Sequence, residues 1–373
     1  MKRIGIFLIK FILNLIYLVF KLRKSKEKIV MLSRQSNEIS IDFRLLKENF
    51  EKRGVEVVIL CKKLEPGVKN LLLYSLHIIQ AMYHLGNSRY CIIDGYSIPV
   101  SLLVHKKQLR VLQLWHALGA IKKFGYQILD MQEGSKRETA EILNMHRKYT
   151  YVTCASEETK KIFTKSFDIP TKKIKIAGMP RVDYLKNLKD NYNKNIYTDY
   201  PHLKEKKNIL YVPTFRKKKS VKYQELIDVI DKDKYNLIVR LHPLDKNKVS
   251  DKYALDKKYS TYDLLQIADY IITDYSAVAI EASILNKPVY FYLYDIKKYK
   301  EGRGLNIDVT EKMKSSTSRD PKVISEKIKS GKYNFRELKK FRESYIETLD
   351  FDNTDAIVNL IMNGEPDEDS KKN

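Results

Sequence analysis

The stretch that decides the fold is KIVMLSRQSNEISIDFRLLKENFEKRGVEVVILC, residues 28–61. Short apolar runs at 28–33 and 55–61 predict two buried strands, and the amphipathic segment 42–53 between them predicts a helix. Strands that alternate with helices in this way form parallel sheets covered on both faces. We therefore expect an α/β fold that starts close to residue 28.

The same alternation continues along the chain. The expected strands lie at 90–94, 110–115, 151–155, 173–177, 208–212, 236–241, 270–273 and 288–292, and the expected helices at 71–85, 222–230, 261–268, 276–286 and 335–349. A polar stretch at 186–207 separates the two halves and predicts a linker. We therefore predict two doubly wound Rossmann-type domains, 26–190 and 191–360, that face a cleft, followed by a disordered tail at 361–373.

Composition limits the classes of partner and chemistry. The chain has 373 residues, of which 43% are hydrophobic, which suits two cores, and its net charge is +24. Such a charge fits nucleic acid, an anionic membrane or a phosphate-rich substrate; because no long basic tail is present, we expect the last two and no nucleic acid. The three cysteines form no CxxC pair, which argues against a zinc site or a disulfide framework.

The N-terminal segment 1–25 predicts a membrane-associated helix. Residues 4–20 are almost wholly apolar and have basic flanks, but the run is short for a spanning helix and contains Lys10 and Asn14. Arg3, Lys10, Asn14, Tyr17 and Lys21 fall on one stripe, which favours a helix in the membrane interface with lysine snorkelling outward. A spanning anchor and a helix packed on the protein remain as alternatives. The basic flanks predict a peripheral protein on the cytoplasmic side of the cell membrane.

Two histidines directly follow predicted strands, one in each half. Ligands of open parallel sheets bind beyond the carboxyl ends of the strands, so His116 and His242 are the catalytic candidates. A histidine at this position can act as a general base near neutral pH. Gly119 and Lys122, on the loop after His116, are expected on the acceptor side, where the backbone at Gly119 can approach a phosphate closely.

A second group of strand-end residues offers phosphate contacts. It comprises Thr273, Asp274, Ser276, Thr214, Arg216 and Arg181, with Glu281 as a ribose contact. Ordinary structural roles are the alternative: helix capping for Asp274 and Ser276, and an ion pair with Asp183 for Arg181. No HExxH, GxSxG, P-loop or DxD motif is present, so we expect neither a metal nor a cofactor.

Five segments together resemble one known family. WHALGAIKKFG (115–125), GMPRVDYL (178–185), VPTFR (212–216), RLHP (240–243) and TDYSAVAIEASILNKPVYFYLYD (273–295) are similar to the CDP-glycerol glycerophosphotransferases of teichoic acid synthesis. The segment LSRQSNEISIDF (32–43) is also similar. The resemblance implies a GT-B-like fold and transfer of glycerol phosphate or ribitol phosphate from CDP-glycerol or CDP-ribitol to a lipid-linked acceptor, with release of CMP.

The resemblance also implies roles for individual residues. His116 matches the histidine proposed to activate the acceptor hydroxyl, His242 the one proposed to contact the donor phosphates, and Ser276 the turn that holds the donor phosphate. The chain reads WHALGAIKK where many polymerases read WHG-T-P-x-K, and it lacks their extra N-terminal domain, which favours a primase-like enzyme. A GT-B glycosyltransferase and a non-catalytic membrane- or polyanion-binding protein are the alternatives. The sequence predicts no oligomeric state.

Overall fold

The protein is described here from a computed structural model covering residues 2–188, 194–216, 221–242, 245, 249–255 and 258–364. The chain forms two compact units, each built around its own parallel sheet. Unit 1 comprises residues 1–117, 124–183 and 347–373, and unit 2 comprises residues 118–123 and 184–346. The predicted disordered tail lies outside the described residues, apart from 361–364.

Unit 1 contains a six-stranded sheet in the order β2-β1-β3-β4-β5-β6, and its strand pairs are all parallel. The strands are β1 (Lys26–Ser33), β2 (Glu56–Cys61), β3 (Ser88–Ile93), β4 (Arg110–Gln113), β5 (Tyr151–Cys154) and β6 (Ile174–Ile176). Their central residues are buried aliphatics, as expected for strands covered on both faces. The six strands that the sequence predicts in this half are all present.

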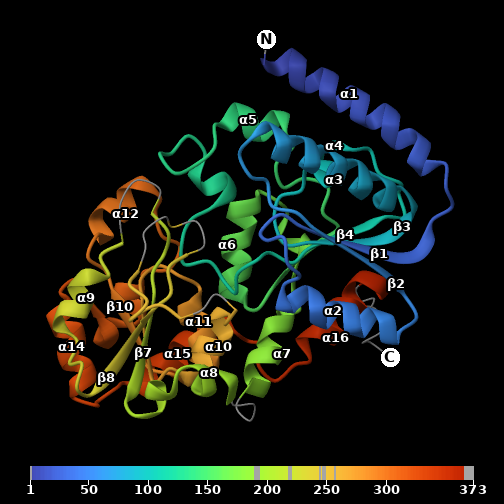
Figure 1. The fold of residues 1–373 in the computed structure, drawn as a ribbon. Coiled ribbons are helices and arrows are strands. Elements are labelled where there is room, and N and C mark those ends of the chain that lie inside the picture. The colour runs from blue at the N-terminus through green and yellow to red at the C-terminus, as the bar shows by residue number, and fades with distance from the viewer. Residues whose placement is uncertain are drawn as a thin grey trace. The chain divides into compact units, whose positions relative to one another are not determined.

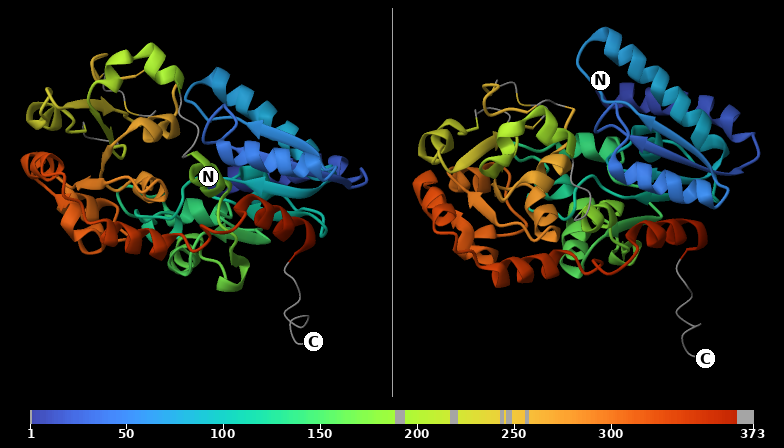
Figure 2. Two further views of the ribbon diagram at one scale, coloured as in Figure 1. Left: turned by 90° about the horizontal axis from the view of Figure 1, so that it is seen from below. Right: turned by 60° about the horizontal axis from the view of Figure 1, so that its bottom comes forward.

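Helices cover both faces of this sheet (Figure 1). One face carries α3 (Val68–Asn87) and α4 (Ile98–Leu102), and the other carries α2 (Ile41–Lys52) and the C-terminal helix α16 (Asn353–Asn363). The unit also contains α5 (Arg137–Ile142), α6 (Glu157–Phe167) and the first half of α7 (Pro180–Asn187), whose second half belongs to unit 2. Helix α16 packs on α2, as Figure 2 shows, so the segment from residue 347 onward belongs to unit 1, whereas the sequence-based division ends the second domain at 360.

Unit 2 contains a five-stranded parallel sheet in the order β11-β10-β9-β7-β8. The strands are β7 (Lys207–Val212), β8 (Tyr235–Val239), β9 (Tyr270–Thr273), β10 (Val289–Tyr292) and β11 (Thr317–Ser318). The helices are α8 (Lys194–Asp199), α9 (Gln224–Val229), α10 (Thr261–Ile267), α11 (Val278–Ile284), α12 (Ile296–Gly302), α13 (Val309–Lys312), α14 (Pro321–Lys329) and α15 (Phe335–Tyr345). The predicted linker is thus partly helical, because α7, α8 and a short 3₁₀ turn occupy much of it.

The N-terminal helix α1 (Lys2–Lys21) packs on unit 1 through the stripe that the sequence predicts to face outward. The Asn14 side chain accepts a hydrogen bond from the Val104 amide at 2.8 Å, and the Lys21 ammonium donates to the Val104 carbonyl at 2.8 Å. Gly86 of α3 allows the close approach, since a Cβ there would lie 2.8 Å from the backbone of Phe20. Asn14, Tyr17 and Lys21 of the predicted polar stripe are thus bound to protein, which agrees with the alternative of a helix packed on the protein, and the outward snorkelling of Lys10 stays a prediction.

The opposite, apolar side of α1 is exposed. Phe7 is 70% exposed, and the other large side chains on this side are also open to solvent. Among the described residues, no helix combines the length and the apolar character that crossing a membrane requires.

A half-buried histidine makes the attachment of α1 sensitive to acid. His105 Nε2 donates to the Val100 carbonyl at 2.8 Å, so Nδ1 accepts the hydrogen bond from the Tyr17 hydroxyl at 2.9 Å. Burial lowers the pKa of His105 to about 4. A protonated Nδ1 could no longer accept from Tyr17.

We predict that the free energy of unfolding falls as the pH drops from 6.5 towards 4. Over that range the unfolded chain binds a proton at His105 and the folded chain does not. The contribution of neutral His105 to the free energy of unfolding is therefore fully present above the unfolded pKa and is lost as the pH falls towards the folded pKa. The loss is on the order of 2–3 kcal/mol at pH 4, from about 1.4 kcal/mol per pKa unit. Urea unfolding followed by circular dichroism at several pH values measures it. His105→Gln should remove only its own share of the loss, because burial also lowers the pKa of His146, to about 3, whereas the exposed His202→Gln should leave the profile unchanged.

Candidate functional site

A strained turn places His116 at the carboxyl end of the unit 1 sheet. Strand β4 ends at Gln113, two residues earlier than predicted, and Trp115 has a positive φ of 67°, which is unfavourable for a bulky residue. The Trp115 amide donates to Gln113 Oε1 at 2.9 Å, and the indole stacks on Phe124 with 4.3 Å between ring centroids. These contacts stabilise the turn, which leaves the His116 side chain exposed.

The imidazole of His116 is oriented by the neighbouring strand end. Its Nδ1 lies 3.1 Å from the main-chain oxygen of Asp94, which directly follows β3. A carbonyl only accepts, so we assign the proton to Nδ1, which makes Nε2 the acceptor nitrogen. The Gln35 side-chain amide also lies 3.3 Å from Nδ1, and with this tautomer its oxygen rather than its nitrogen faces the ring. A histidine that acts as a general base through Nε2 requires this tautomer, in which Nδ1–H is held by a fixed hydrogen-bond acceptor.

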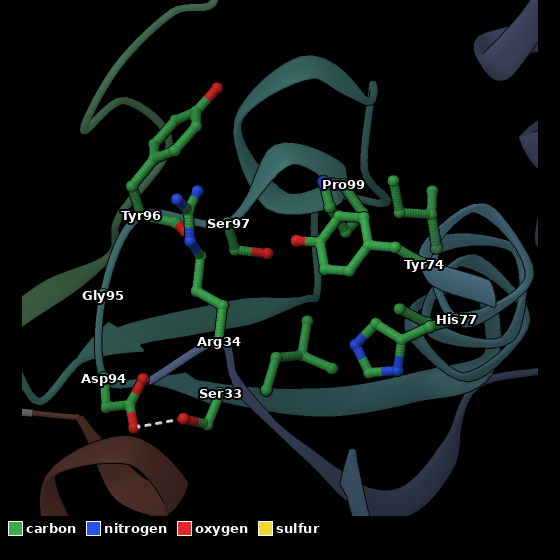
Figure 3. Close-up of a pocket in the computed structure, with 12 residues that line it drawn as sticks. Ser33, Arg34, Tyr74, His77, Asp94, Gly95, Tyr96, Ser97 and Pro99 are labelled. Atoms are coloured by element: carbon green, nitrogen blue, oxygen red, sulfur yellow. Dashed lines mark hydrogen bonds between the residues drawn. The ribbon is translucent and has the colours of Figure 1, made fainter. Parts of the chain in front are cut away.

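A pocket opens beside His116, lined by residues that follow β1 and β3 and by one face of α3 (Figure 3). Ser33 donates to Asp94 Oδ2 at 2.7 Å, and the other carboxyl oxygen, Oδ1, is buried without a hydrogen-bond partner among the described residues. Burial raises the pKa of Asp94 to about 6. The carboxylate therefore lacks part of the solvation that a hydroxyl or amide donor would provide.

In unit 2 the predicted phosphate contacts gather around Asp274, which is fully buried after β9. Its Oδ1 accepts from the amide of Thr214 at 2.9 Å and from the amide of Tyr275 at 2.6 Å. Its Oδ2 accepts from the Arg216 guanidinium at 2.9 Å. Asp274 thus ties the loop after β7 to the loop after β9, the two neighbouring strand ends of this sheet.

Arg216 is held by two carboxylates. Besides Asp274, it contacts Asp295, with 2.9 Å from Nε to Oδ2, and its side chain is only 7% exposed. The guanidinium also lies over the rings of Tyr275 and Tyr299, which stack at 4.0 Å. Its donors are therefore largely used inside the protein, and its geometry favours shaping the loop. Direct contact of Arg216 with a phosphate stays a prediction.

The remaining donor-side candidates have mixed environments. Thr273 is buried and donates to the Val212 carbonyl at 2.7 Å, and Glu281 is buried and accepts from the Tyr262 hydroxyl at 3.1 Å. Ser276 is half-buried in the turn before α11, which begins at Val278 rather than at the predicted residue 276. These contacts suit structural roles as well as binding.

His242 and the loop after His116 also belong to the carboxyl ends of strands. The His242 side chain is exposed and faces Phe215, with 5.6 Å between ring centroids; Pro243 lies outside the described residues. Gly119 has a φ of 74°, and the Lys122 carbonyl accepts from Asn306 at 3.0 Å. Residues 118–123 thus form part of unit 2, although we predict Gly119 and Lys122 on the acceptor side.

Arg181 lies in unit 1 and is paired with Asp42, which the sequence analysis did not anticipate. Its Nε lies 3.0 Å from Asp42 Oδ2, its main-chain amide donates to Oδ1 at 2.9 Å, and both residues are buried. The expected alternative partner, Asp183, accepts from Asn353 and Thr354. This geometry favours a structural role for Arg181, and its contact with the donor phosphate remains an untested prediction.

Sequence reasoning missed Arg34 and Asp94 as site residues. Each follows a strand directly, whereas His116 lies three residues after β4, so the strand-end rule would have identified them. Within the described ranges, no cluster of three or more His, Cys, Asp or Glu residues could hold a metal ion.

Comparison with known proteins gives a consistent result. The sequence profile of the CDP-Glycerol:Poly(glycerophosphate) glycerophosphotransferase family matches residues 15–363. The chain is 34% identical over 313 residues to the teichoic acid glycerol-phosphate primase of Bacillus subtilis (strain 168), covering 80% of each chain. It is 29% identical over 358 residues to the teichoic acid ribitol-phosphate primase of Bacillus spizizenii (strain ATCC 23059 / NRRL B-14472 / W23), covering 90% of each.

A solved structure has the same fold. It is a histidine variant of the wall teichoic acid polymerase TagF soaked with CDPG, and it superposes with a TM-score of 0.70 at 20% identity, covering 96% of this chain and 97% of that one. This likeness supports a GT-B-like arrangement of two parallel sheets.

Substituting Asp42 tests whether Arg181 has a structural role or binds phosphate. We predict that Asp42→Ala lowers the free energy of unfolding by about 3–5 kcal/mol, because it leaves a buried guanidinium without its partner. Thermal unfolding followed by circular dichroism measures the loss. Glu158→Ala, which breaks an exposed pair with Lys161, is the control and should leave the midpoint unchanged. A stable Asp42→Ala chain with a raised KM for CDP-glycerol would instead favour phosphate binding by Arg181.

Proposed function

Because this chain belongs to the CDP-glycerol:poly(glycerophosphate) glycerophosphotransferase family, it transfers glycerol phosphate or ribitol phosphate from a CDP-polyol donor in wall teichoic acid synthesis, and we propose that it does so as a primase. The two primases named above match it over most of their own length, which supports this assignment. The proposed acceptor is a lipid-linked glycan or polyol phosphate.

His116 is the proposed general base, and its orientation is the observation that carries the mechanism. With Nδ1–H directed at the Asp94 carbonyl, Nε2 takes the proton of the acceptor hydroxyl. The oxygen then attacks the polyol-side phosphorus of the donor in line. A new P–O bond forms, the bond to the bridging oxygen of the pyrophosphate breaks, and CMP leaves with the electron pair.

The strand ends of unit 2 are the proposed donor site. His242 is exposed after β8 and can contact the donor phosphates, and Ser276 lies half-buried in the turn after β9. Arg216 and Asp274 hold the loops after β7 and β9 in place. We assign these two residues a positioning role, because a preorganised loop stabilises charge on a leaving phosphate without reorganising during the reaction.

The expected result of His116→Ala is a loss of about 10²–10⁴-fold in turnover, the usual contribution of a general base. The measurement is CMP release from CDP-glycerol and CDP-ribitol with a lipid-linked disaccharide acceptor, and UDP-sugars serve as rival donors. The exposed His202→Ala is the matched control. Near-normal turnover by His116→Ala would refute the assignment of the base, and release of UDP without CMP would refute the donor class.

We also propose that the protein works at the surface of an anionic membrane, bound through α1 and α3. Most of the exposed large apolar side chains among the described residues belong to these two packed helices; on α3 they include Val68, Leu72 and Leu76. A continuous apolar surface of this kind is unusual on a free protein. Neither helix contains an acidic residue, and exposed Arg23, Lys24 and Lys26 follow α1 directly. This charge suits acidic lipid headgroups.

Replacing Phe7, Phe11 and Leu15 of α1 with serine should lower binding to vesicles that contain phosphatidylglycerol by more than tenfold. Each large side chain gains on the order of 1–3 kcal/mol on leaving water, and these three are at least 49% exposed in the free protein. Vesicle co-sedimentation measures the effect. Serine substitutions at the exposed Val323 and Phe335 of unit 2 are the control. Equal binding by the α1 variant would contradict this docking surface.

A further inference from the structure

The pocket beside His116 lies where parallel sheets usually bind ligands. From β1 the sheet continues to β2 on one side and to β3 on the other, so the ends of β1 and β3 mark the point at which the strand order reverses. Ligands of open α/β sheets bind at such points. The pocket is lined by residues that follow these two strands and by α3, all within unit 1.

Three hydrogen-bond donors converge on one side of the pocket. The Arg34 guanidinium is half-buried and makes one long hydrogen bond, 3.5 Å, to the Tyr96 carbonyl. Within the described part of the chain it has no carboxylate partner. The hydroxyls of Tyr74 and Ser97 point towards the same space (Figure 3), and both residues are about nine-tenths buried. Neither hydroxyl has a hydrogen bond to another described residue. Hydrogen-bond donors that lack an acceptor in the protein favour the binding of an anion.

The opposite side of the pocket offers an acceptor. Asp94 is 5% exposed, Ser33 occupies one of its carboxyl oxygens, and the other has no partner among the described residues. In Figure 3 this second oxygen points away from Ser33 into the pocket. A buried acceptor of this kind is costly unless a donor reaches it. The pocket therefore suits a ligand that combines an anionic group with a hydroxyl.

The size of the pocket limits the ligand further. The cavity itself has a volume of about 20 Å³ and opens to solvent through its mouth. This is room for about one small polar group at the floor, with the rest of the ligand in the mouth. A nucleotide base or a whole phosphate is too large for the floor, which admits one hydroxyl, so the phosphate of the ligand lies in the mouth.

We propose that this pocket binds the terminal polyol phosphate of the acceptor: Arg34, Tyr74 and Ser97 hold its phosphate, and Asp94 Oδ1 accepts a hydrogen bond from its hydroxyl. This inference rests on the proposed function and adds the chemical class of the acceptor end. The main-chain oxygen of Asp94 orients His116, so one residue connects the bound hydroxyl with the base.

The position of α3 fits a lipid-linked ligand. The helix presents Tyr74, His77 and Ala81 to the pocket, whereas Leu72 and Leu76 on another face are 63% and 56% exposed. The pocket wall and the proposed membrane surface are therefore two faces of one helix. A lipid-anchored acceptor at the membrane needs to reach only across α3.

The single tryptophan makes a direct binding test feasible. Trp115 is the only tryptophan of the chain, and its ring lies 4.2 Å from that of His116. Titration of the full chain with sn-glycerol 3-phosphate should change its fluorescence, inorganic phosphate should bind more weakly, and glycerol alone should give no saturable change. No saturable response to glycerol 3-phosphate would overturn the proposal.

Two substitutions separate the anion and hydroxyl contacts. Arg34→Gln should weaken both phosphate ligands about tenfold or more, through loss of a charge-assisted hydrogen bond. In Asp94→Asn the oxygen that accepts from Ser33 is retained and an NH₂ faces the pocket, so affinity for glycerol 3-phosphate should fall to that for inorganic phosphate. Arg89→Gln, at the opposite end of β3, is the matched control. Tyr74→Phe removes only one hydroxyl, and it tests the phosphate contact if Arg34→Gln fails to fold.

Kinetics distinguish failure of this inference from failure of the proposed function. With a lipid-linked acceptor that ends in glycerol phosphate, the acceptor KM should rise in Arg34→Gln while the KM for CDP-glycerol stays unchanged. An unchanged acceptor KM, with normal CMP release, would overturn the subsite alone. No CMP release by the parent chain from either CDP-polyol would overturn the proposed function instead.

Discussion

The arrangement of polar groups in this protein follows from the burial of its parallel strands. A strand covered on both faces cannot carry unpaired polar side chains, so the chemically useful groups are confined to the loops after the strands. In both units they gather where the strand order reverses, at β1 and β3 in one sheet and at β7 and β9 in the other. Arg34 and Asp94 follow the first pair of strands, and Thr214 and Asp274 follow the second.

The two units use these strand ends differently. In unit 2 the buried charges satisfy one another, because Asp274 and Asp295 share Arg216 and leave little unpaired. Such a network makes the loops rigid, which suits the binding of a donor in one fixed pose. In unit 1 the guanidinium of Arg34 and the carboxylate of Asp94 line one pocket with unused hydrogen-bonding capacity. Unsatisfied buried groups cost stability, so their presence favours a role in binding.

Helix α1 illustrates that a sequence pattern defines the faces of a helix but not the partner of each face. Its sequence predicts a polar stripe and an apolar face, and both exist. The stripe nevertheless binds unit 1, because Asn14 satisfies the Val104 amide and Tyr17 bonds to His105, groups that lie some 90 residues away in the sequence. Periodicity fixes which residues share a face, but the partner of each face depends on distant residues. The result is a helix attached by polar contacts that presents its apolar side outward.

The sequence by itself determined the class of fold, the strands other than β11 and the position of both histidines in loops after strands, because apolar runs and helical periodicity are local properties. It also located the phosphate candidates, although it could not separate binding from structural roles. Tertiary structure alone decided that Arg181 pairs with Asp42, that Arg216 is shared by two aspartates, and that α16 returns to unit 1. It likewise decided that Asp94 keeps one oxygen unpaired. These contacts join residues that are far apart in the sequence, and the role of a buried charged side chain depends on the partner that it contacts.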